Sequence, residues 1–194
     1  MFKDFDVSLV STMDANVLVA EFQQLYTINN LSSVRNSWRK WCKAVVDSAR
    51  FLSSFEDVEN FDEFVKSFAY NADTRAALPL YLSANIRGLG FALCCDVLKE
   101  LGYLDYPKPD THIIKICRSL DLVRDEKQMS AFRAIVDLAT DNGQTPYKTD
   151  KILWIISTGE FYKDKDSNGD VLRVKPRKTE FMEQARKAVG MIAE

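Results

Sequence analysis

The part of the sequence with the greatest capacity for chemistry runs from Ile86 to Asp110. It opens with Ile-Arg-Gly-Leu-Gly at residues 86–90, between two stretches whose apolar residues have helical spacing. A turn of this kind exposes backbone N–H groups at the start of the second helix, where the helix dipole adds about half a positive charge. Glycine also lets a phosphate approach the backbone closely. The segment therefore predicts an anion site, and a purely structural turn is the alternative.

A proline-rich loop and an aspartate follow this turn. Residues 102–109 include Pro107 and Pro109 and cannot be helical, because each proline restricts itself and the residue before it. Asp110 then stands at the N-cap position of a further helix, 20 residues after Gly90. A carboxylate held in this way can act in hydrolysis. Its alternative role is an ordinary helix cap, which contributes about 1 kcal/mol to stability.

The order of hairpin, Gly/Pro-rich loop and aspartate resembles the helix-hairpin-helix superfamily of DNA glycosylases. Residues 86–90 match the family hairpin and residues 102–109 match its loop. The Asp-Thr-His-Ile run at residues 110–113 is similar to the segment that carries the catalytic aspartate in endonuclease III. The resemblance implies an all-α, glycosylase-like fold whose hairpin unit spans about residues 74–101. It also implies that double-stranded DNA containing a lesion is the partner, and that Asp110 supports excision of a flipped damaged or mispaired base.

The resemblance assigns DNA contacts to the hairpin and to nearby lysines. The residues expected to bind DNA are Arg87, Gly88, Leu89, Gly90, Lys108 and Lys115. A monovalent cation would be held by the backbone carbonyls of Ala84, Ile86 and Leu89. The alternative for the basic side chains is that they are merely solvated, as most exposed charges are.

Two departures from the family pattern narrow the expected activity. Bifunctional members carry a lysine two residues after the second hairpin glycine, where this chain has Ala92. We therefore expect a monofunctional glycosylase that uses water and lacks lyase activity, because the amine for a Schiff base is missing. The alternative is a catalytically inactive helix-hairpin-helix module that binds DNA or a protein partner, and a third possibility is a helical protein whose turn has no function. No cysteine follows Cys117, so we expect neither the iron–sulfur cluster of endonuclease III nor another cofactor.

A flipped base also needs a pocket with aromatic walls. The sequence offers three aromatic residues outside the strongest core pattern, namely Tyr106, Tyr147 and Trp154. Trp38 and Trp41 instead have the spacing of core residues on a helix.

The elements that must position these residues are almost all helices. Helical spacing and capping residues predict helices at about residues 14–30, 32–53, 60–68, 74–84, 91–101, 111–120, 126–140, 146–157 and 179–192. The helix near residue 74 tolerates Pro79 only if this proline lies close to its start. Residues 161–175 form the one plausible β-hairpin, with a turn at Asn168-Gly169. This turn explains residues 164–170 more simply than a calcium loop, since Lys175 occupies the place of the essential glutamate.

Composition limits the remaining possibilities. The 194 residues are 46% hydrophobic and carry a net charge of −2, which indicates a single domain, possibly of two lobes, and disfavours nucleic-acid binding by bulk charge. The single histidine, His112, rules out a three-histidine zinc site within one chain. The first ten residues do not resemble a signal peptide, and no apolar run approaches the roughly 18 residues of a membrane span. We expect the four cysteines to be buried and reduced. We also expect a cytoplasmic monomer that shares its compartment with the genomic DNA and has no membrane partner.

Overall fold

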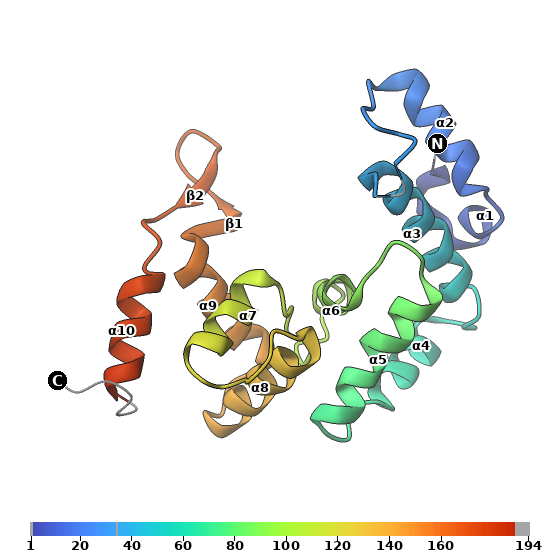
Figure 1. Ribbon diagram of the computed structural model, residues 1–194. Helices are drawn as coiled ribbons and strands as arrows, with labels where there is room; N and C mark the ends of the chain where they lie inside the picture. Colours follow the sequence, from blue (N-terminus) through green and yellow to red (C-terminus); the bar gives the residue numbers. More distant parts are fainter. Residues whose placement is uncertain (1, 34, 189–194) are drawn as a thin grey trace. The chain divides into compact units, whose positions relative to one another are not determined.

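The computed structural model describes residues 2–33 and 35–188, and it contains two compact units. The first unit ends at Cys94 and the second begins at Cys95, so the boundary falls inside helix α6, Phe91–Glu100. The described chain is mostly helical, with one small antiparallel sheet near its C-terminal end (Figure 1). The prediction of a helical protein with a C-terminal β-hairpin is therefore confirmed at this level.

The first unit contains a short 3₁₀ helix and five complete α-helices. These are η1 Lys3–Phe5, α1 Val7–Ser11, α2 Ala15–Leu25, α3 Ser37–Leu52, α4 Val58–Lys66 and α5 Ala72–Asn85. Helices α2 and α3 share a buried core made by Leu18, Val19, Phe22, Cys42 and Val46. Side chains cap the helices as their residue types favour: the Asp14 carboxylate accepts a hydrogen bond from the Asn16 amide at the start of α2.

The second unit is built from four helices and the strand pair. Its complete elements are α7 Thr111–Ser119, α8 Gln128–Asp141, α9 Pro146–Thr158, β1 Glu160–Lys165, β2 Val171–Arg173 and α10 Lys178–Ala188. Its core residues are Ile113, Ile116, Cys117, Val123, Ala131, Ile135, Leu153 and Met182. The strands pair through Glu160 with Arg173 and Phe161 with Leu172, and the hairpin turns at Asn168-Gly169 as predicted.

Three details of the first unit differ from the predictions. Helix α3 begins at Ser37 instead of Ser32, because Asn36 caps it through the Arg39 amide. Pro79 lies in the middle of α5, where it is buried beside Leu78, so core packing outweighs the lost backbone hydrogen bond. Trp41 is 43% exposed and does not belong to the core.

The remaining fold predictions concern the termini, the cysteines and membranes. The end of the helix predicted to reach residue 192 lies outside the described residues, which carry α10 to Ala188. All four cysteines are buried, as expected. Within residues 2–33 and 35–188, every helix is too short or too polar to cross a lipid bilayer.

Candidate functional site

The predicted hairpin is a tight turn between α5 and α6 in the first unit. The Ile86 amide donates to the Leu82 carbonyl at 2.8 Å and ends α5, and the Leu89 amide donates to the Ile86 carbonyl at 3.3 Å across the turn. Gly88 has φ of +99°, and a Cβ atom built on it would lie 2.2 Å from the Lys40 carbonyl oxygen of α3. Glycine is therefore favoured at this position for two reasons: the backbone is left-handed, and the turn lies too close to α3 for a side chain.

The second hairpin glycine has different surroundings. A Cβ atom on Gly90 would meet nothing within 4 Å, and the Gly90 carbonyl accepts the Cys94 amide at 3.0 Å in the first turn of α6. The predicted phosphate contact at Gly90 would therefore meet an open side of the backbone. The cation predicted at the carbonyls of Ala84, Ile86 and Leu89 stays a prediction, and the Ile86 carbonyl already accepts the hydrogen bond of the turn.

Arg87 has a partner that the sequence did not reveal. Its Nε atom lies 2.7 Å from Asp47 Oδ2, its terminal nitrogen lies 2.9 Å from Asp47 Oδ1, and its own amide donates to Oδ2 at 3.1 Å. The hydrogen bond from the Arg87 side chain lowers the pKa of Asp47, against the effect of burial. Arg87 thus fastens the hairpin to α3, while its side chain remains 64% exposed. Its predicted DNA contact is not tested by this pairing.

A basic cavity of about 310 Å³ adjoins this ion pair within the first unit. Its cationic lining residues are Lys43, Arg50 and Arg87, and residues 12–16 at the start of α2 complete the wall. Arg50 donates to the carbonyls of Ser11 and Met13, both at 2.9 Å, and so joins α3 to the link before α2. Residues 1–100 contain 10 basic and 13 acidic residues, so their composition does not reveal this local concentration of positive charge.

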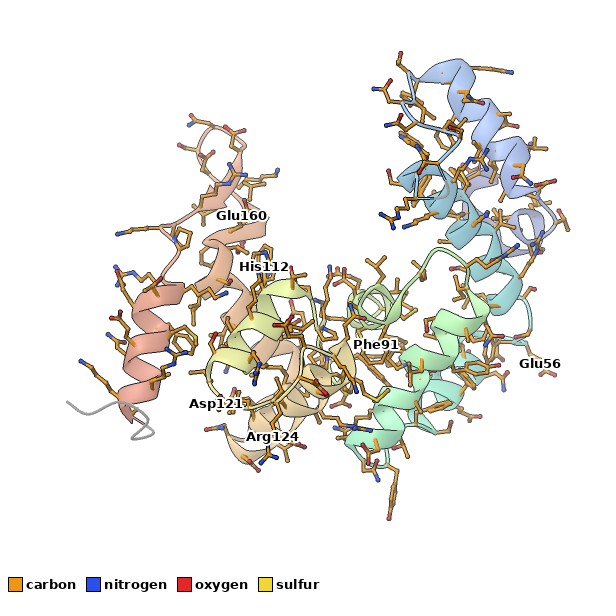
Figure 2. All side chains as sticks on the ribbon, in the orientation of Figure 1. Glu56, Phe91, His112, Asp121, Arg124 and Glu160 are labelled. Carbon is orange, nitrogen blue, oxygen red and sulfur yellow. The ribbon has the colours of Figure 1, made fainter. Side chains whose placement is uncertain are left out.

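Asp110 in the second unit is the predicted catalytic residue, and the structure places it at the N-cap of α7 as expected. Its Oδ1 atom accepts the amides of His112 at 2.8 Å and of Ile113 at 3.0 Å. Both capping bonds therefore use a single oxygen, and among the described residues no donor contacts Oδ2. His112, labelled in Figure 2, contacts Ser157 of α9 through Nδ1 at 3.0 Å.

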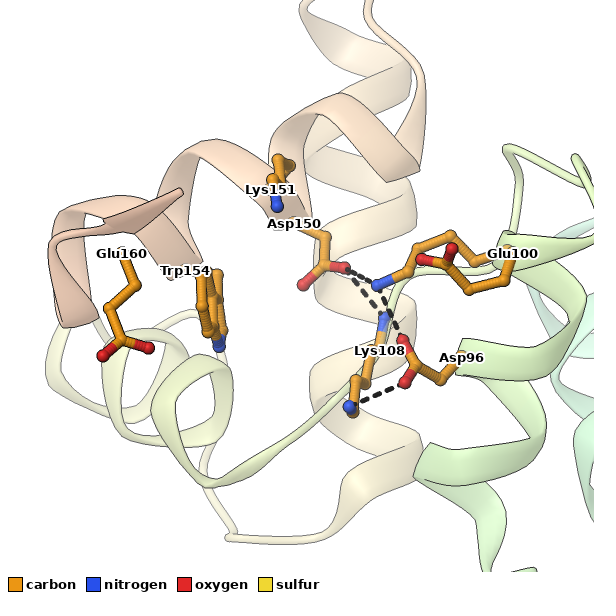
Figure 3. A pocket seen from close by; sticks show the side chains of 8 residues that line it. Asp96, Glu100, Lys108, Asp150, Lys151, Trp154 and Glu160 are labelled. Carbon is orange, nitrogen blue, oxygen red and sulfur yellow. Dashed lines mark hydrogen bonds and ion pairs between the residues drawn. The ribbon is translucent and has the colours of Figure 1, made fainter. Parts of the chain in front are cut away.

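A cavity of about 350 Å³ lies in the same unit (Figure 3). Its lining residues are Asp96, Lys99, Glu100, Lys108, Asp150, Lys151, Trp154 and Glu160. The backbone amide of Lys108 donates to Asp150 Oδ2 at 3.2 Å. Burial raises the pKa of Asp150, and the negative charge of Asp110 adds to this rise. Lys99 opposes the rise.

A chain of ion pairs crosses this cavity. Lys99 Nζ lies 3.0 Å from Asp96 and 3.3 Å from Asp150, and Lys108 Nζ lies 2.8 Å from Asp96. Burial alone would lower the pKa of Lys99, but the two carboxylates together raise it. Lys99 is therefore held as an ammonium ion. Sequence reasoning missed Asp96, Lys99 and Asp150, because Asp150 lies 51 positions from Lys99 and 42 from Lys108, and the i,i+3 pair of Asp96 and Lys99 is by itself an ordinary pair on a helix.

The other predicted site residues fall in three kinds of place. Trp154 lines the cavity, whereas Tyr147 is half-buried and donates its backbone amide to the Leu104 carbonyl at 2.9 Å. Tyr106 is only 2% exposed, with its ring 6.3 Å from that of Phe132, so it is a core residue instead of the predicted pocket wall. Lys115 is exposed on α7, and its charge helps burial to lower the pKa of Lys178.

The described residues contain no group of three or more His, Cys, Asp or Glu side chains arranged to hold a metal ion. In the segment that resembles half a calcium loop, Asp166 Oδ1 instead accepts the amides of Asn168 and Asp170 and closes the hairpin turn. Comparisons of the chain with family models, with curated proteins and with solved structures found no match.

Proposed function

We propose that the protein is a monofunctional DNA glycosylase of the helix-hairpin-helix type, which hydrolyses the N-glycosidic bond of a flipped damaged or mispaired base. The observation that carries this proposal is the state of Asp110. Its Oδ1 atom caps α7 through two amides, and its Oδ2 atom has no donor among the described residues. The capping hydrogen bonds hold the carboxylate in place through Oδ1, so Oδ2 remains available for chemistry.

In this reaction Asp110 and Trp154 of the second unit have separate roles. The bond between the base and C1′ of the sugar breaks as positive charge develops on the sugar, and a fixed carboxylate stabilises that charge. Water then forms the new bond to C1′ and gives its proton to Asp110 or to the leaving base. Trp154 offers a planar wall for the flipped base in the cavity of the same unit.

The amines of the cavity support a reaction through water. A Schiff base requires an unprotonated lysine, whereas Asp96 and Asp150 hold Lys99 in its charged form. Lys108 is paired with Asp96 at 2.8 Å. Together with alanine at position 92, these pairings favour base removal without strand cleavage.

DNA binding in this proposal uses the hairpin and the basic surface of the first unit. Residues 35–54 contain the basic residues Arg35, Arg39, Lys40, Lys43 and Arg50, and their one acidic residue, Asp47, is paired with Arg87. Local positive charge of this kind binds phosphates even though the whole chain has a net charge of −2.

The test is an excision assay on duplexes that each carry one modified base. We expect alkali-labile sites on at least one duplex, no strand cleavage before alkali, and loss of excision in Asp110→Asn. Asparagine caps helices as well as aspartate does, so this variant should fold and bind DNA normally. DNA binding that persists without any excision by the native protein would favour the inactive-module alternative.

A further inference from the structure

The cavity of the second unit is lined by Asp150, a largely buried carboxylate of which only one oxygen accepts hydrogen bonds from described residues. Asp150 is 3% exposed, and both of its hydrogen bonds, from Lys99 Nζ and from the Lys108 amide, go to Oδ2. Among the described residues no donor contacts Oδ1. In Figure 3 this second oxygen of Asp150 points away from the dashed hydrogen bonds of Oδ2, on the side of Trp154. Oδ1 is thus a carboxylate oxygen at the cavity to which an N–H group of a ligand can donate a hydrogen bond.

From this arrangement we propose that the cavity reads an exocyclic amino group on the flipped base, with Asp150 Oδ1 as its acceptor and Trp154 as the stacking wall. The inference rests on the proposed function and adds a substrate class to it. Bases with an amino group, such as derivatives of adenine, cytosine and guanine, are accepted. Uracil, thymine and hypoxanthine are disfavoured.

The charges that line the cavity determine whether it favours anionic ligands or neutral and cationic ones. The lining carries four acidic residues, Asp96, Glu100, Asp150 and Glu160, against the three lysines Lys99, Lys108 and Lys151. A phosphate or carboxylate ligand would face the unpaired oxygen of Asp150 and be repelled. Two of the three lysines are already paired, because Lys99 is shared between Asp96 and Asp150, and Lys108 is bonded to Asp96. The cavity therefore suits a neutral or cationic ligand that donates hydrogen bonds.

The geometry of base edges separates amino groups from other donors. An exocyclic amino group projects beyond the ring and reaches a carboxylate oxygen without bringing a carbonyl against it. The ring N–H of uracil stands between two carbonyl oxygens, which would approach the carboxylate together with the donor. Because Asp150 Oδ2 is already occupied by two donors, only a single-point contact is available.

The size and the aromatic wall fit a base. The volume of about 350 Å³ lies at the lower end of the range of about 300–1,000 Å³ for small-molecule sites. Lys151 Nζ lies 5.2 Å from the centre of the Trp154 ring, which shows that this ring already accepts a positively charged neighbour. Stacking on such a ring contributes binding for every base, while Asp150 supplies the discrimination.

The test measures binding of free bases to the full chain by calorimetry, without DNA and without turnover. Adenine is compared with purine, which has the same rings but no amino group. We expect adenine to bind about 10- to 100-fold more tightly, as for a hydrogen bond to a charged acceptor. Equal affinities for adenine and purine, or no binding of adenine, would overturn the inference.

Asp150→Asn gives a sharper readout than loss of affinity. The asparagine oxygen can keep the donors Lys99 and Lys108, and its NH₂ group then faces the cavity in place of an acceptor. The preference should therefore reverse, so that hypoxanthine, with a carbonyl in place of the amino group, binds more tightly than adenine. Thermal melting establishes that the variant is folded. A folded variant that keeps the native preference would contradict the role of Asp150.

Tryptophan variants test whether Trp154 forms the stacking wall of the cavity. Trp154→Ala should weaken adenine and purine equally, because stacking does not depend on the amino group. Trp41→Phe, at an exposed tryptophan of the first unit, is the matched control and should leave both affinities unchanged. Equal effects of the two variants would refute the assignment of Trp154.

The outcomes also separate this inference from the proposed function. Selective binding of adenine without excision from any duplex would support the amino-reading pocket and oppose the glycosylase. Excision of uracil as efficient as that of amino-bearing bases would support the glycosylase and overturn the selection by Asp150.

Discussion

Replacing Gly88 by alanine tests the packing of the hairpin against α3. The φ of +99° at this position is unfavourable for a residue with a side chain, at a cost of about 1–2 kcal/mol. The new Cβ atom would also lie 2.2 Å from the Lys40 carbonyl oxygen, far inside contact distance, and the backbone must shift to relieve this overlap. Overpacking of this kind costs about 1–3 kcal/mol.

The two effects together predict a loss of about 2–5 kcal/mol in the free energy of unfolding. At about 2–4 °C per kcal/mol for a chain of this size, Tm should fall by roughly 4–20 °C. The assay is urea unfolding followed by circular dichroism, with a thermal melt as the second measurement.

Gly90→Ala is the matched control for this experiment. A Cβ atom at Gly90 meets nothing within 4 Å, so stability should change by less than about 0.5 kcal/mol. If Gly88→Ala and Gly90→Ala have the same stability, the close approach of the hairpin to α3 is wrong.

Three further perturbations test the electrostatics of the structure. Asp47→Asn should have a lower free energy of unfolding than the native chain at pH 7, and the difference should shrink as the pH falls below 3.8. The pKa of Asp47 is lowered in the folded chain, so its stabilisation is present at higher pH and is lost when the carboxylate is protonated. Urea unfolding at several pH values measures this difference, and a difference that does not change with pH would show that the pair with Arg87 is unimportant. The thiols of Cys94 and Cys117, whose pKa values burial raises to about 11, should react with a thiol reagent at pH 8 far more slowly in the folded than in the unfolded chain, and equal rates would contradict their burial. Lys43→Gln should reduce the slope of log affinity for duplex DNA against log salt concentration by about 1, whereas an unchanged slope would exclude Lys43 from phosphate binding.

The parts of the fold that follow from local chemistry could be predicted from the sequence. Asp110 was expected to cap a helix, and Asp14 and Thr145 are of residue types that favour this position; each accepts a backbone amide at the start of a helix. The turn at Asn168-Gly169 was predicted from a dipeptide that favours tight hairpins. Such features depend on a few neighbouring residues, so the sequence contains the necessary information.

Features that depend on partners far along the chain could not be predicted. Arg87 was expected to face DNA, but its partner Asp47 lies 40 positions away, and Lys99 and Asp150 are separated by 51 positions. Pro79 was expected near a helix start, yet burial beside Leu78 holds it in the middle of α5. Tyr106 carried no local sign that its ring would enter the core.

The central claim is that the free oxygen of Asp110 acts in base excision. The most direct measurement is the single-turnover rate of base release from a duplex substrate, compared between the native chain and Asp110→Asn at equal DNA occupancy. We expect the variant to bind the duplex as tightly as the native chain and to release the base at least about 100-fold more slowly, because it has lost a positioned acid–base group. Equal rates of release in the two proteins would contradict the central claim.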